Sequence, residues 1–571
     1  MRADGAARRV AGARRAGEHA LLIEASNEAD VPAIAAAVRE RVAGVEVVPA
    51  ARTVLVDGIA GDPDALALEV EGWEIDLLTA EAGALVELPV VFDGEDLAAV
   101  AQLWGTTADG VVARTVAVEF SVGFCGFAPG FGYLTGLPAE LAVPRRPSPR
   151  TRVPAGAVGF AGPYAGVYPR ESPGGWQLVG RLAPGAPALW DTHREHPALL
   201  APGTRVRFVE AHGEPAQVVA ASAGAAPPHG DGTRPGAVSS EAAGDAHQPA
   251  SAGFEVLRAG ALSTVQDRGR PGHAHLGVPR SGAADLPALA LANQLVGNGP
   301  DAAAVETTAT GITLRSRGDA VIAVTGADAP VWVGSVPAPL RAPIRLSAGQ
   351  VLEVGAPERG WRSYVAVRGG IGVHAVLGSR STDLLSGLGP APLRDGDEVP
   401  VLAAPRLGEA GFQALRASAG LSGTPTSLEL TVTLGPREDW FRSQAIEALL
   451  TREYVVTGDS NRVGLRLEGP ALERERTGEI ESEGMVLGAV QVPPSGQPVI
   501  FLADHPVTGG YPVIAVVDAA GVAAAAQARP GDVLRFRVRP GSPASQDVAG
   551  SGHRATARAQ AQREWMDRRE E

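Results

Sequence analysis

Several acidic and histidine side chains lie in short runs where they could act as acids or bases. Asp267 lies between a glutamine and an arginine, and Asp504 and His505 come just before a Gly-Gly-Tyr run. A carboxylate and an imidazole are the usual groups for proton transfer. Adjacent residues of a strand point to opposite faces, so Asp504 and His505 would not pair directly in a strand. We take Asp504, Asp267 and His505 as catalytic candidates, with a turn or surface carboxylate as the alternative for each acid. The same alternative applies to Asp285 and Asp459.

A second group of residues has the chemistry of anion binding. The segment 144–152 holds Arg145, Arg146 and Arg150 among prolines, which stiffen the backbone. Guanidinium groups bind carboxylates or phosphates with two parallel hydrogen bonds. The alternative is a solvated basic loop, or ion pairs with an acidic surface.

Glycine pairs beside aromatic residues recur in both halves of the chain. Gly174 and Gly175 precede Trp176, and Gly510 precedes Tyr511. A glycine pair can expose backbone N–H groups to a ligand beside an aromatic platform, but it also forms simple tight turns.

Cysteine and lysine usage exclude several chemistries. The chain has one cysteine, Cys125, which excludes an internal disulfide and whose apolar neighbours predict a buried thiol. Every basic residue other than histidine is arginine, so the chain has no phosphate-loop lysine and no lysine that could carry covalently bound biotin. His273 and His275 lack a nearby third ligand, and we predict no metal site.

Composition limits the class of protein. A chain of 571 residues is too long for one core. Its net charge of −14 argues against nucleic acid or an anionic membrane as a partner. No apolar run reaches the length of a membrane helix, and the single cysteine fits a reducing cytoplasm, where we expect the protein.

Periodicity predicts a mainly β protein with an α+β domain at its N-terminus. Strands are expected at 20–24, 45–48, 53–56 and 85–92, with helices at 28–43 and 96–103. Three similar turn–strand runs, at 202–208, 348–354 and 530–536, indicate three β-barrels of one kind. The predicted division is a disordered arm over 1–18, a small α+β domain over 19–92, a barrel over 93–210, a flexible linker over 211–252, barrels over 253–415 and 416–540, and a polar tail over 541–571.

These segments resemble one known family. Residues 19–210 resemble the B subunit of 5-oxoprolinase, also called allophanate hydrolase subunit 1 or the Kip inhibitor. Residues 253–540 resemble the C subunit, also called allophanate hydrolase subunit 2 or the Kip antagonist. The first half carries the resemblance in the segments 88–97, 126–134, 144–154 and 168–181. The second half carries it in the segments 264–272, 277–282, 291–298, 460–464, 488–493 and 504–512.

The resemblance implies cyclophilin-like barrels and a fusion of the B and C subunits that works with a separate A subunit. Such a complex hydrolyses 5-oxo-L-proline to L-glutamate with ATP as co-substrate. We expect the ATP site to be shared with the partner subunit, and the resemblance leaves the requirement for Mg²⁺ open. The arginines and glycine loops would hold phosphate and carboxylate while Asp504 orients water. Further binding candidates from the same segments are Gln266, Arg270, Asn293, Arg462, Gln491 and Thr508.

Two other functions remain open at this point. One is a carboxyltransferase acting on a urea-like substrate with a separate biotinylated carrier, and the other is a regulator of a sensor histidine kinase. Relatives of the first half usually carry a histidine where this chain has Thr115, and some relatives of the second half carry a lysine where it has Val513. Every interpretation that involves catalysis requires the two halves to form one cleft to which both contribute.

Overall fold

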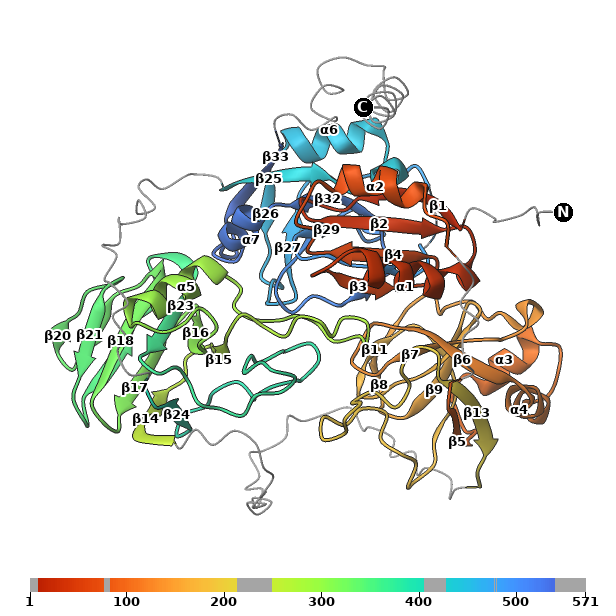
Figure 1. Ribbon diagram of the computed structural model, residues 1–571, viewed down its shortest axis with the longest axis horizontal. Coiled ribbons are helices and arrows are strands. Elements are labelled where there is room, and N and C mark those ends of the chain that lie inside the picture. The colour runs from red at the N-terminus through yellow and green to blue at the C-terminus, as the bar shows by residue number, and fades with distance from the viewer. Residues whose placement is uncertain are drawn as a thin grey trace, which may run out of the picture.

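The computed structural model describes residues 9–75, 83–212, 249–404, 428–476, 478 and 480–539. Most of the predicted linker and all of the predicted tail lie outside these ranges. We name four parts: the N-terminal sheet (9–75), the first barrel (85–210), the middle domain (249–404) and the C-terminal barrel (428–539). Figure 1 shows the N-terminal sheet against the C-terminal barrel, with the first barrel and the middle domain on either side below them.

The N-terminal sheet is antiparallel, with the strand order β1-β2-β4-β3. Its elements are β1 (Val10–Arg15), β2 (Ala20–Ala25), a 3₁₀ turn (Glu28–Asp30), α1 (Val31–Arg41), β3 (Glu46–Pro49), β4 (Thr53–Asp57) and α2 (Pro63–Glu71). The prediction of a disordered arm over 1–18 is wrong where the chain is described, because β1 pairs with β2. The short β1 segment lacks a strong pattern of alternating apolar residues. Its pairing with β2 stabilises it instead.

Both faces of this sheet are buried, against different partners. Leu21 and Ile23 of β2 pack under α1 and α2, whereas Leu22 packs with Leu55 of β4 against Phe501 of the C-terminal barrel. Alternate side chains of a strand point to opposite faces, so an unbroken apolar run marks a strand covered on both sides.

The first barrel closes with seven strands: β5 (Leu85–Val91), β6 (Glu119–Cys125), β7 (Gly132–Thr135), β9 (Ala157–Ala161), β10 (Tyr164–Val167), β12 (Gln177–Leu182) and β13 (Arg205–Glu210). It also carries α3 (Leu97–Leu103), α4 (Ala108–Ala117), a 3₁₀ turn (Ala139–Leu141) and the separate pair β8 (Arg150–Val153) and β11 (Ser172–Gly174). The predicted boundary at 92/93 misplaced β5, which pairs in parallel with β13 and belongs to the barrel.

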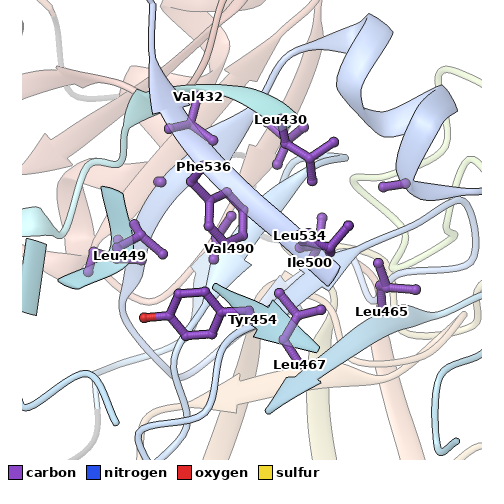
Figure 2. Packing of buried hydrophobic residues seen from close by; sticks show 14 of the residues in the cluster. Leu430, Val432, Leu449, Tyr454, Leu465, Leu467, Val490, Ile500, Leu534 and Phe536 are labelled. Carbon is purple, nitrogen blue, oxygen red and sulfur yellow. The ribbon is translucent and has the colours of Figure 1, made fainter. Parts of the chain in front are cut away.

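The C-terminal barrel also closes with seven strands: β25 (Leu428–Leu434), β26 (Tyr454–Val456), β27 (Gly464–Glu468), β29 (Ala489–Gln491), β30 (Val499–Phe501), β32 (Val513–Val517) and β33 (Val533–Val538). A 3₁₀ turn (Glu438–Trp440), α6 (Ser443–Thr451), α7 (Ala519–Ala525) and the pair β28 (Glu483–Gly484) and β31 (Thr508–Gly509) complete it. Figure 2 shows its core, where Tyr454 and Phe536 lie among leucine, isoleucine and valine side chains.

The two barrels share one topology. If the strands of each are counted in chain order, their neighbours run 1-6-4-5-3-2-7 in both, and strand 7 closes onto strand 1 in parallel. The predicted kinship of the turn–strand runs at 202–208 and 530–536 fits this result, since both lead into the last strand of a barrel.

The middle domain consists of two sheets instead of one closed barrel. One has six strands, β20 (Val336–Pro337), β19 (Val331–Val333), β22 (Val351–Val354), β17 (Ile312–Ser316), β14 (Pro249–Arg258) and β24 (Glu398–Leu402). The other has five, β15 (Leu262–Gln266), β16 (Ala304–Thr308), β23 (Arg359–Val367), β18 (Ala320–Asp328) and β21 (Pro343–Leu346), and α5 (Leu286–Leu295) packs on it. The run at 348–354 leads into β22, which is not the last strand of this domain. β14 begins within the predicted linker, which is therefore too long by four residues.

Candidate functional site

A cavity of about 370 Å³ lies where the N-terminal sheet, the segment 274–287 and the C-terminal barrel meet. Its wall is mostly apolar, with Val48 and Leu55 on one side and Met485 and Val507 on another. Its polar side chains are few: Glu46, Asp57, Arg280, Ser281 and His505. A concave, mostly apolar space with a few polar groups is the usual form of a small-molecule site. Both halves of the chain contribute to it.

His505 has a fixed tautomer at this cavity. Its Nδ1 lies 2.9 Å from the carbonyl oxygen of Pro506, and its ring stacks on Phe501 with centroids 5.9 Å apart. Because a carbonyl only accepts, Nδ1 carries the proton of the neutral ring and Nε2 is left as an acceptor. Burial lowers the pKa of His505 below its ordinary 6.5. The ring is therefore neutral at pH 7.

Two carboxylates face the cavity from adjacent strands of the N-terminal sheet. Glu46 of β3 lies directly opposite Asp57 of β4, an arrangement of like charges that costs stability in a sheet. Glu46 accepts hydrogen bonds from the backbone N–H groups of Gly272 (2.7 Å) and Ala274 (3.1 Å) and so holds that loop. Burial, with Glu46 nearby, raises the pKa of Asp57, and Arg280 opposes the rise.

Arg280 is held in place by its own backbone and by its neighbour. Its carbonyl oxygen accepts from the Arg270 N–H at 2.8 Å. Ser281 follows in the left-handed region, at φ 54°, which is strained for a residue other than glycine. The Ser281 hydroxyl lies 2.6 Å from Asp504 Oδ1 and 3.2 Å from the Thr382 carbonyl oxygen, and these bonds offset the strain.

Asp504, predicted to orient water, is instead the centre of a buried ion-pair network. Arg462 donates to it with Nε (2.9 Å) and Nη2 (3.0 Å), and Leu384 N–H donates at 3.2 Å. Arg462 also bonds Glu306. With Ser281 included, both oxygens of this fully buried carboxylate are satisfied. Asp504 therefore positions the residues beside it, Ser281 and His505, and has no free oxygen for water in this arrangement.

Asp267 is satisfied in the same way within the middle domain. Its oxygens accept from the hydroxyl groups of Ser379 (2.6 Å) and Ser381 (2.5 Å) and from the Arg380 N–H (2.6 Å). Gln266 donates to the Thr382 carbonyl oxygen at 3.0 Å. Arg270 is almost fully buried, 4.0 Å from Asp383. These predicted site residues fix the loop 379–383 and do not reach the cavity wall.

The arginines of the first barrel have acidic partners. Arg146 Nη1 lies 2.8 Å from Asp96, and Arg150 Nη2 lies 2.9 Å from Asp96 and 3.0 Å from Glu95. Burial alone would raise the pKa of Asp96, but the bond from Arg150 and the other arginine hold it below its usual range. Arg146 and Arg150 therefore form ion pairs within the first barrel itself.

The glycine–aromatic runs form packed contacts. A Cβ on Gly174 would clash with the Tyr168 hydroxyl oxygen, and Trp176 is buried in a cluster of aromatic rings with Phe131. Gly175 accepts from the Arg146 N–H at 2.8 Å through its carbonyl oxygen. These residues shape the end of the first barrel that faces the C-terminal half.

That end of the barrel contacts the Gly-Gly-Tyr run of the C-terminal barrel directly. The Phe127 N–H donates to Thr508 Oγ1 at 3.1 Å, and Gly510 lies close to the Arg145 guanidinium. Gln491 donates to the Tyr511 carbonyl oxygen at 3.1 Å. The first barrel therefore packs on the loop that follows His505 but supplies none of the cavity's lining residues.

Other candidates have local structural roles. Asn293 Nδ2 donates to the Ala302 carbonyl oxygen at 2.7 Å, and Asp285 caps α5 by accepting from the Ala288 N–H at 3.0 Å. Cys125 is buried, as predicted, and burial raises its pKa to about 12. Thr115 is buried in α4 and Val513 in β32, neither of them on the cavity wall. Asp459 is exposed.

Sequence reasoning missed Glu46, Asp57 and Arg280. The two carboxylates lie at matching ends of two strands that were predicted, so their strand positions were an available signal. Arg280 lies within the family-like segment 277–282 and was passed over. The described residues contain no group of three or more His, Cys, Asp or Glu side chains arranged to hold a metal ion. No helix in the described ranges is long and apolar enough to cross a membrane.

Comparisons with known proteins match both halves. The carboxyltransferase domain model for subdomains C and D matches residues 12–200, and that for subdomains A and B matches residues 276–538. The chain is 37% identical over 293 residues to the C subunit of 5-oxoprolinase from Escherichia coli (strain K12), covering 50% of this chain and 90% of that protein. It is 43% identical over 173 residues to the B subunit of 5-oxoprolinase from Escherichia coli O157:H7, covering 29% and 77% respectively.

A solved structure matches across both halves together. The crystal structure of TTHA0988 is similar with a TM-score of 0.74 and 34% sequence identity, over 92% of this chain and 99% of that one. The same succession of domains therefore occurs in another single chain.

Proposed function

Because this chain belongs to the carboxyltransferase-domain family that includes the B and C subunits of 5-oxoprolinase, we propose that it is the joined B and C component of an ATP-dependent 5-oxoprolinase. With a separate A subunit it hydrolyses 5-oxo-L-proline to L-glutamate. The requirement for ATP makes it a cytoplasmic protein in this proposal.

The observation that carries the proposal is the shared cavity. Glu46 and Asp57 come from the half that resembles the B subunit, and Arg280 and His505 come from the half that resembles the C subunit. A site lined by both halves supports the proposal that the two parts act together in one chain.

The cavity does not suit the triphosphate of ATP. Its wall offers one arginine, Arg280, against two acidic side chains, Glu46 and Asp57, whereas a triphosphate needs several cations or backbone N–H groups. Arg146 and Arg150 are paired with Asp96. We therefore place ATP at a site shared with, or carried by, the A subunit.

Glutamate release tests the function. The purified full chain is mixed with its cognate A subunit, ATP and 5-oxo-L-proline, and glutamate is measured against each protein alone. Release above both controls supports the proposal. A mixture with no additional glutamate would reject it, and carboxylation of urea from a carrier loaded with carboxybiotin would then favour the carboxyltransferase alternative.

A further inference from the structure

Among the cavity's polar groups, His505 is an uncharged acceptor whose orientation is fixed by its own bonding. Its Nδ1 is bonded to the Pro506 carbonyl oxygen, and its Nε2 has no hydrogen-bond partner among the described residues. Because His505 lines the cavity, its Nε2 can accept a hydrogen bond from water or from a ligand there. A ligand that bonds Nε2 must supply an N–H or O–H group.

Arg280 is the complementary element at the edge of the same cavity. It is the only cationic side chain, besides any charged form of His505, among the residues that line the cavity. Its side chain is exposed and lies near the Asp57 carboxylate, and a guanidinium can bind the carboxylate of a ligand with two hydrogen bonds.

The buried network fixes the backbone beside these two groups. Asp504 precedes His505 in the chain and bonds Ser281, which follows Arg280. Arg462 holds Asp504 through two bonds. A rigid backbone of this kind limits the positions that the two side chains can take.

We propose that this cavity is a binding site for a small cyclic amide that bears a carboxylate, with His505 Nε2 accepting the ring N–H and Arg280 binding the carboxylate. The apolar wall from Val278, Leu286 and Val507 covers the carbon atoms of the ring. This assignment deepens the proposed function and rests on it for the identity of the ligand, 5-oxo-L-proline.

The pKa of His505 agrees with this role. Burial lowers that pKa below 6.5, so the neutral ring keeps Nε2 as an acceptor at physiological pH.

Titration calorimetry on the full chain alone tests the site with a matched pair of ligands. 5-oxo-L-proline is compared with the lactone of the same ring and carboxylate, in which oxygen replaces the N–H. The wild-type chain should bind the lactone about 10- to 100-fold more weakly, since the lactone leaves Nε2 without a donor. Equal affinities for both ligands would overturn the role of His505. Because this comparison uses only the wild-type chain, it does not depend on whether a variant folds.

Variants then assign the two contacts. His505→Gln keeps an acceptor oxygen near the Nε2 position and should still prefer the lactam, whereas His505→Ala should bind both ligands equally. Arg280→Gln should weaken both ligands by about 10-fold or more, while the exposed Arg345→Gln in the middle domain should change neither. Unchanged binding by Arg280→Gln would remove Arg280 from the site.

Parallel turnover measurements separate this inference from the proposed function. If the chain binds 5-oxo-L-proline as described but releases no glutamate with the A subunit, the site stands and the function fails. If the complex releases glutamate and the chain alone shows no binding, the function stands and the assignment of the cavity is wrong.

Discussion

Phe127 and Thr508 are separated by 381 positions in the chain, yet the Phe127 N–H donates to Thr508 Oγ1 at 3.1 Å. Phe127 has a φ of 64°, in the left-handed region, and its neighbour Gly126 faces the same threonine. The contact joins the first barrel to the loop that follows His505. Because Gly126 lies so close to Thr508, one methyl group added at position 126 would disturb the packing between the two halves.

Gly126→Ala should destabilise the chain by about 1–3 kcal/mol, because its Cβ would clash with Thr508 Oγ1. In a Thr508→Ala background the clashing oxygen is gone and the nearest remaining atom of residue 508 lies 3.1 Å away. The effect of the alanine at 126 should then be smaller, with a coupling of about 0.5–3 kcal/mol. Urea unfolding of the wild type, the two single variants and the double variant measures this double-mutant cycle.

Gly61→Ala is the matched control, since nothing lies within 4 Å of a Cβ at that position. It should leave the free energy of unfolding nearly unchanged. If the losses of unfolding free energy from Gly126→Ala and Thr508→Ala simply add in the double variant, the contact between positions 126 and 508 would be contradicted.

Arg462→Met should destabilise the chain by about 3–5 kcal/mol, because it leaves Asp504 buried without its paired cation and leaves Glu306 with Arg362 alone. The exposed pair Arg535 and Glu453 provides the comparison, and Arg535→Met should cost at most about 1 kcal/mol. Chemical unfolding followed by tryptophan fluorescence measures both. Equal effects would show that the network contributes no more than a surface ion pair.

Binding of 5-oxo-L-proline should be stronger at pH 8 than in acid and should weaken as the pH falls through the pKa of His505. His505 has a pKa below 6.5, and once protonated its Nε2 can no longer accept the ring N–H. The charged groups facing it are Glu46 and Asp57 from the N-terminal sheet, Arg280 at the cavity edge and Asp504 next in the chain.

Protonation of Asp57, whose pKa is raised by burial and by Glu46, acts in the opposite direction, since it removes a negative charge near the ligand carboxylate. His505→Gln separates the two effects, because it retains Asp57 but cannot take up the proton. Calorimetry across the pH range should show no acid weakening in this variant. A weakening identical to wild type would assign the titration to another group.

Cys125, the single cysteine, should resist thiol reagents in the folded chain. Burial raises its pKa from 9.0 to about 12, which lowers the thiolate population by a factor on the order of 1,000. Labelling at pH 8 should be slow in buffer and complete within minutes in guanidinium chloride. Rapid stoichiometric labelling of the native chain would show that the barrel opens where Cys125 lies beside Leu276.

Local sequence signals predicted the elements that depend on local periodicity. The strands β2, β3 and β4 and the helix α1 follow from alternating or helical apolar patterns, and their positions were predicted within a few residues. The strand β1 was missed because its stability comes from pairing with β2. β5 was found but assigned to the wrong domain, since its parallel partner β13 lies more than one hundred positions later.

The sequence by itself determined the family, the mainly β architecture and the segments that gather where the halves meet, because these depend on residue types and on their order along the chain. Only the tertiary structure decided which polar side chains are already satisfied. Asp504 and Asp267 have the residue type of a catalytic acid, yet their oxygens are filled by Arg462 and by serine hydroxyls. Glu46, Asp57 and Arg280 have no such motif, yet strand pairing and the packing of distant segments bring them to one cavity. Hydrogen-bond saturation and exposure depend on neighbours that are distant in the chain, and no local pattern encodes them.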